Sequence, residues 1–145
     1  MDTRFFYQNN QRCYKREVII SSFTKLVASV IDLPAIVEVC LYPMDKNVYG
    51  GIDMIRVNRI GINVEIPLES IPKILTHELI HVSQKHTGIL KINREGVCYW
   101  HGTAYTNQSP KDMSYQDYLE LPWEVDVQNR LDSVFKEALQ AYKKT

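Results

Sequence analysis

The chain lacks the features of a membrane or secreted protein. None of its apolar runs reaches the roughly 20 residues that a membrane-spanning helix needs. Its three cysteines, Cys13, Cys40 and Cys98, are an odd number without a CxxC spacing, unlike the disulfide framework of a small secreted domain. The first residues contain no signal-peptide pattern. We therefore expect a cytoplasmic protein whose thiols are buried and reduced.

Neither sign of charge is in excess. Seventeen Lys and Arg residues balance seventeen Asp and Glu residues, whereas a nucleic-acid-binding domain carries a clear basic excess. Hydrophobic residues make up 45% of the chain and charged residues 23%, which is typical of a globular protein and excludes a disordered one. With 145 residues and no internal repeat, the chain is expected to form one domain, residues 1–145.

The spacing of apolar residues predicts both helices and strands, and hence an α+β fold. The expected elements are helices at residues 17–33, 70–86 and 122–142, strands at residues 35–42, 52–57 and 60–66, a hairpin within residues 89–105 and a short helical turn near Tyr115. Ser70 is a candidate N-cap for the second helix, which Gly88 is expected to end. Strict alternation in residues 60–66 predicts a half-buried strand at the sheet edge.

The second predicted helix contains an HExxH motif, residues 77–81. Residues four apart share one helix face, about 5–6 Å apart at Cβ, so His77 and His81 can bind one metal ion. Glu78 lies roughly 100° around the helix, from where its carboxylate can reach a metal-bound water without binding the metal. A zinc ion with three protein ligands keeps a position for water and lowers its pKa to about 7. The motif thus predicts one Zn²⁺ per chain, with Glu78 as general base.

The third metal ligand is predicted less directly. Glu124 falls in the middle of the apolar stripe of the last helix, where a carboxylate is costly unless it is paired or binds a metal. Asp126 falls roughly on the opposite side and can face water. We therefore predict Glu124 as the ligand, the alternative being a first-turn acid favoured by the helix dipole. A metzincin is excluded because Gln84 and Thr87 occupy its Gly and His positions, and His86 lies on the far side of the helix from His77.

Three segments resemble small predicted zincin peptidases of bacteria and phages. They are HELIHVSQ at residues 77–84, Trp100-x-Gly102-x-x-Tyr105, and LPWEVD at residues 121–126. In these gluzincin-like proteins a Glu on a later helix, often after Pro-Trp, completes HExxH. The resemblance spans residues 36–139. It implies a minimal zincin-like domain with a small mixed sheet packed on the HExxH helix, a backing N-terminal helix and a C-terminal Glu-bearing helix.

The resemblance also implies a protein or peptide substrate, whose backbone would pair with residues 60–66 as an added strand. The chain departs from it at Asp126-Val127, where many such proteins carry Glu-Ala, so Asp126 stays an alternative ligand. Two other functions stay open: a catalytically silent zincin scaffold that only binds, and a metal-assisted hydrolase of a non-peptide amide. The retained Glu78 argues against the silent scaffold, because a structural zinc has no use for it.

His101 is another candidate for the third ligand. Residues 94–96 and 101–102 resemble SprT-type proteases of DNA–protein crosslinks, although their third histidine belongs to a helix and residues 102–106 here predict a strand. If His101 is no ligand, it is a polar cleft residue or a surface histidine. Three tyrosines are candidates for a phenol that donates to a tetrahedral oxyanion, each with the alternative of a half-buried ring whose hydroxyl meets water: Tyr105, Tyr115 and Tyr118.

Overall fold

The computed structural model describes residues 1–8, 11–53, 55–105 and 113–143. Four strands form the main sheet in the order β1-β2-β4-β3. Of these, β1 (Asp2–Tyr7), β2 (Ile36–Tyr42) and β4 (Arg59–Asn63) run parallel, while β3 (Gly50–Ile52) is antiparallel to β4. The strand predicted at residues 35–42 is confirmed as β2. The sequence does not predict β1, because polar residues make up half of that short strand.

The prediction is wrong about which strand lies at the sheet edge. Strand β4 pairs with β2 on one side and with β3 on the other, so residues 60–66 contribute an interior strand that ends at Asn63. The strand predicted at residues 52–57 ends at Ile52 instead. Asp53 Oδ1 accepts hydrogen bonds from the N–H groups of Ile55 and Arg56, both 2.8 Å long, and this turns the chain out of the sheet.

The three predicted long helices are present, with some different ends. Helix α1 (Tyr14–Ala28) stops before residue 33, and the following N–H groups bond to carbonyls of its last turn. A 3₁₀ turn, η1 (Leu68–Ser70), leads into α2 (Ile71–Thr87). Ser70 occupies the N-cap position as predicted, but its side chain makes no capping hydrogen bond to the described residues. Gly88, with a φ of 84°, ends α2 as expected. Helix α4 (Pro122–Lys143) matches the predicted last helix.

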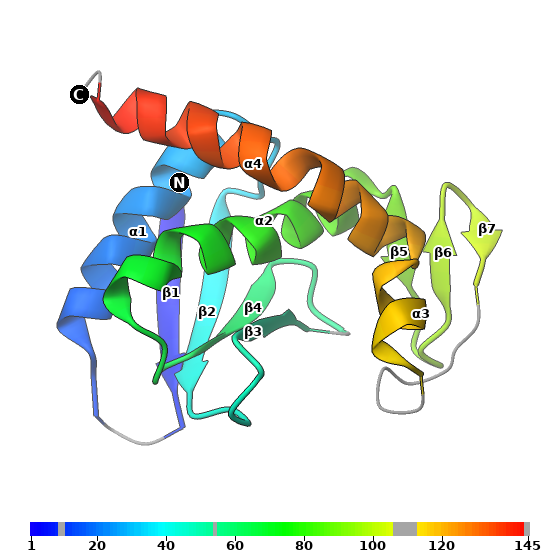
Figure 1. Cartoon of the computed structure of the whole chain (residues 1–145), viewed down its shortest axis with the longest axis horizontal. Helices are drawn as coiled ribbons and strands as arrows, with labels where there is room; N and C mark the ends of the chain where they lie inside the picture. The colour runs from blue at the N-terminus through cyan, green and yellow to red at the C-terminus, as the bar shows by residue number, and fades with distance from the viewer. Residues whose placement is uncertain (9–10, 54, 106–112, 144–145) are drawn as a thin grey trace.

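Helices α1, α2 and α4 lie together on one side of the main sheet (Figure 1). One apolar face of α2 is fully buried and comprises Ile71, Leu75, Leu79 and Val82. It packs with residues of β2 and β4 and with the inner face of α4 in one core. In the apolar stripe of α4, Trp123, Val127, Val134 and Ala138 are buried, Leu131 and Phe135 are partly buried, and Tyr142 near its end is exposed. This packing places the middle of α2 directly against the first turns of α4.

A second, smaller sheet follows α2. It consists of β5 (Leu90–Ile92), β6 (Cys98–Trp100) and β7 (Thr103–Ala104), all antiparallel, which confirms the predicted hairpin. The helical turn predicted near Tyr115 is α3 (Tyr115–Leu119), capped by the side chain of Ser114. Figure 1 shows that α3 lies next to the beginning of α4.

The three cysteines are unpaired, as expected from the sequence, but they are less buried than expected. Cys13, Cys40 and Cys98 are free, but each is partly exposed rather than buried. Burial nevertheless raises the pKa of the Cys40 and Cys98 thiols, which makes reactive thiolates unfavourable at those positions. Within the described residues, no helix combines the length and the apolar character needed to cross a membrane.

Candidate metal centre

Helix α2 presents His77 and His81 to α4, one helical turn apart. Their ring centroids are 5.1 Å apart and the ring planes make an angle of 70°. His81 is buried, with 2% of its surface exposed, whereas about a third (32%) of the His77 side chain is exposed. His81 therefore lies in the interior and His77 lies near the surface. Burial lowers the pKa of His77, which favours the neutral imidazole that a metal binds.

Glu124, in the first turn of α4, completes this group. Its Oε1 lies 3.0 Å from His81 Nε2 and its Oε2 lies 3.7 Å from His77 Nε2. The ligand atoms of the three residues all lie within 4.8 Å of one another, close enough to hold a metal ion. Burial acts to raise the pKa of Glu124, but the hydrogen bond and charge of His81 lower it overall. Two imidazole nitrogens and an ionised carboxylate form a donor set that suits Zn²⁺.

Asp126 lies outside the group, at the flank of α4. Its Oδ2 accepts hydrogen bonds from Gln84 Nε2 at 2.9 Å and from Arg130 Nη1 at 3.1 Å, and its side chain is only partly exposed. The expectation that Asp126 simply faces water is therefore wrong. The inward position predicted for Glu124 is confirmed, since it is 3% exposed, whereas Asp126 contacts Gln84 of α2.

Glu78 lies beside the ligands, on the side of α2 that faces β3. Its Oε1 is 4.0 Å from His77 Nε2, and the residue is buried. Burial raises the pKa of Glu78 to about 7, against the opposing effect of His81. A carboxyl group with this pKa can both take up and release a proton near neutral pH, as a general base and acid must.

Gly50 in β3 leaves room for the Glu78 side chain. A Cβ at Gly50 would lie 3.1 Å from Glu78 Cγ and 2.9 Å from the Gly61 carbonyl oxygen, whereas a Cβ at Gly51 would meet no atom within 4 Å. We expect Gly50→Ala to push β3 away from α2 and to lower the free energy of unfolding by about 1–3 kcal/mol. Gly51→Ala is the matched control. Thermal unfolding measures both, and equal melting temperatures for the two variants would contradict this account.

Tyr118 is the predicted tyrosine that contacts the group. Its O–H donates to Glu124 Oε1 at 2.8 Å. Burial, reinforced by the charge of Glu124, raises the pKa of Tyr118, so the phenol stays protonated and remains a donor. The contact depends on the tight connection between α3 and α4, in which the Leu121 N–H donates to the Tyr118 carbonyl oxygen at 3.2 Å.

The other predicted site residues lie outside the group. The ring of Tyr105 packs edge to face on Trp123, with centroids 5.8 Å apart, and Tyr115 is 76% exposed. His101 occupies the turn between β6 and β7 with a positive φ of 49°, and its ring packs against Trp100 at 5.1 Å. In the described part of the chain, the residues that come together as ligands are thus the two HExxH histidines and the carboxylate of α4.

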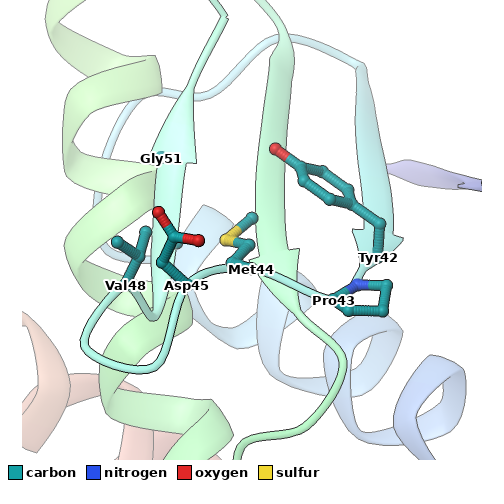
Figure 2. A pocket seen from close by; sticks show the side chains of 7 residues that line it. Tyr42, Pro43, Met44, Asp45, Val48 and Gly51 are labelled. Atoms are coloured by element: carbon teal, nitrogen blue, oxygen red, sulfur yellow. The ribbon is translucent and has the colours of Figure 1, made fainter.

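A pocket of about 510 Å³ lies at the β3 edge of the main sheet. Figure 2 shows the Met44 side chain between the carboxylate of Asp45 and the ring of Tyr42. The residues that line the pocket are Tyr42, Pro43, Met44, Asp45, Val48, Gly50 and Gly51. A Cβ at Gly61 would meet Met44 and Tyr42 of this lining, whereas a Cβ at Gly50 would meet Glu78, so most of the pocket lies on the sheet face opposite to Glu78.

Neither a family model, nor a curated protein, nor a solved structure matches this chain. The resemblance to gluzincin-like peptidases therefore stays a prediction that rests on the three sequence segments quoted above. What the centre does must follow from its own residues: two imidazoles and a carboxylate in position to bind a metal, and a second carboxyl group beside them.

Proposed function

We propose that this protein is a zinc-dependent peptidase. The observation that carries the proposal is the meeting of the HExxH histidines with a buried carboxylate from another helix, beside a second buried carboxyl group. His77, His81 and Glu124 would hold the metal. Zinc bound in this way lowers the pKa of a water molecule and polarises a carbonyl group, which is the chemistry that hydrolysis of an amide requires.

Glu78 supplies the proton transfers in this proposal. It takes a proton from the attacking water and delivers it to the nitrogen of the leaving amine. Its pKa, raised by burial to about 7, suits both steps near neutral pH. Tyr118 holds Glu124 through its O–H, so a role as oxyanion donor would require that hydrogen bond to open.

In this proposal the substrate pairs with a different strand from the one the sequence suggests. Strand β4 cannot accept a further strand, because both of its edges are paired. Strand β3 pairs only with β4 among the described strands, and its Gly50 lies next to Glu78. A substrate backbone would therefore pair with the free edge of Gly50–Ile52, which brings its peptide bond toward the general base.

One zinc ion per chain is the first expected result. Protein purified without an affinity tag and supplied with zinc should contain one equivalent, because the three ligand atoms lie within 4.8 Å of one another. Elemental analysis after removal of free metal measures the content, and His77→Ala should lower it. A wild type that takes up no zinc would overturn the proposal.

Cleavage of a denatured protein then separates peptidase from scaffold. Wild-type protein should cleave it, a chelator should stop the reaction, and added zinc should restore it. Bound zinc without any cleavage would instead support the alternative in which the centre only stabilises a binding module.

A further inference from the structure

Gln84 connects the two helices that carry the metal ligands. The side chain is 1% exposed. Its Oε1 lies 2.9 Å from His81 Nδ1, and its Nε2 donates to the Trp123 carbonyl oxygen at 3.0 Å and to Asp126 Oδ2 at 2.9 Å. One amide thus contacts a ligand on α2 and the residues on both sides of Glu124 on α4. The sequence offers no sign of this role, because two of the three partners, Trp123 and Asp126, lie on α4, 39 and 42 residues further along the chain.

These partners settle the orientation of the amide. A backbone carbonyl and a carboxylate accept hydrogen bonds and do not donate them, so both must face the NH₂ group of Gln84. Its oxygen therefore faces His81, and His81 Nδ1 must carry a proton and donate it. The Nε2 atom of His81, which faces Glu124, is left to bind a metal. Arg130 adds a positive charge on the outer side of Asp126.

We propose that Gln84 is a positioning residue for the zinc centre. It fixes His81 with Nε2 toward the metal, and it holds the first turn of α4 where Glu124 completes the ligand set. The inference rests on the proposed function in that zinc is the bound metal. The side chain at position 84 must accept a hydrogen bond from His81 and donate hydrogen bonds to Trp123 and Asp126. An amide can do both, whereas a carboxylate or an apolar side chain cannot.

Gln84→Met tests the proposal, since Met has a similar length and no amide. Zinc affinity, measured by competition with a chelator, should fall about 10–100-fold, the usual effect of losing a hydrogen-bond partner of a metal ligand. In the zinc-loaded wild type, NMR should show the Nδ1–H proton of His81 as a slowly exchanging signal, and the variant should lose it. Gln140→Met, exposed on α4, is the control and should keep both.

If Gln84→Met fails to fold, substitutions at Gln84 and at its hydrogen-bond partner Asp126 test the same proposal. Gln84→Glu alone sets two carboxylates against each other and should weaken zinc binding. Gln84→Glu combined with Asp126→Asn restores a donor–acceptor pair with position 126, while the Trp123 carbonyl oxygen still meets a carboxylate, so this double variant should recover part of the lost affinity. A double variant that binds zinc no better than Gln84→Glu alone overturns the proposal.

The outcomes separate this inference from the peptidase function. A folded Gln84→Met protein that keeps zinc affinity within about twofold of wild type and retains the Nδ1–H signal overturns it. A loss of thermal stability without a loss of zinc affinity does the same, since Gln84 would then only join α2 to α4. Both measurements are independent of hydrolysis. A wild type that binds zinc but cleaves nothing would refute the peptidase and leave the role of Gln84 to be decided by these variants.

Discussion

Glu78→Gln is expected to retain zinc and the fold while losing nearly all hydrolysis. Gln has the shape of Glu but cannot take a proton from water near neutral pH, so the rate should fall about 10²–10⁴-fold. The change should not harm folding, because burial already disfavours the charged form of Glu78 and raises its pKa to about 7. Cleavage of a denatured protein at saturating zinc measures the loss.

The controls for this variant are zinc content and melting temperature in the same preparation. Glu137→Gln, an exposed change of the same type on α4, should cleave at the wild-type rate. If Glu78→Gln were as active as Glu137→Gln, another group would have to supply the base. If it lost zinc as well as activity, Glu78 would be acting as part of the metal site.

Glu124→Ala is expected to lose zinc almost completely. Glu124 is the carboxylate whose oxygens lie 3.0 and 3.7 Å from the two histidines, so its removal leaves two protein ligands. We expect zinc affinity to fall by more than about 100-fold, beyond the effect of losing a residue that only contacts a ligand. Zinc retention over a series of chelator concentrations measures this directly.

The matched comparison uses three variants with the same readout. Asp126→Ala removes one partner of Gln84 and should weaken zinc binding by less than about tenfold. His101→Ala, in the turn between β6 and β7, should have no effect. Greater zinc loss from His101→Ala than from Glu124→Ala would mean that the centre is SprT-like. Greater loss from Asp126→Ala would transfer the ligand role to that carboxylate.

The ligand residues could be predicted because each depends on local periodicity. The i,i+4 spacing of His77 and His81 fixes their common face as soon as a helix forms. The same periodicity distinguishes Glu124 from Asp126, because Pro122 starts α4 and the apolar stripe sets its phase. Gly88 at the end of α2 is equally local, since a positive φ favours glycine whatever surrounds it.

The strands of the main sheet were predicted less well for a physical reason. Alternation of apolar and polar residues shows which side of a strand is buried, but not which strands lie beside it. Residues 60–66 have the alternation of an edge strand, yet β2 and β3 pair with both sides of β4. The three-residue β3 is too short for periodicity to reveal, and Asp53 ends it with a turn.

By itself, the sequence determined the HExxH pair, the general-base candidate and the helical phase that turns Glu124 inward. Tertiary structure alone decided what surrounds them, because these contacts join residues far apart in the chain. Gly50 meets Glu78 only once β3 lies along α2, and the Gln84 amide meets Asp126 only once α4 packs on that helix. Side-chain contacts between elements depend on where the core places those elements, and short-range periodicity carries no information about that placement.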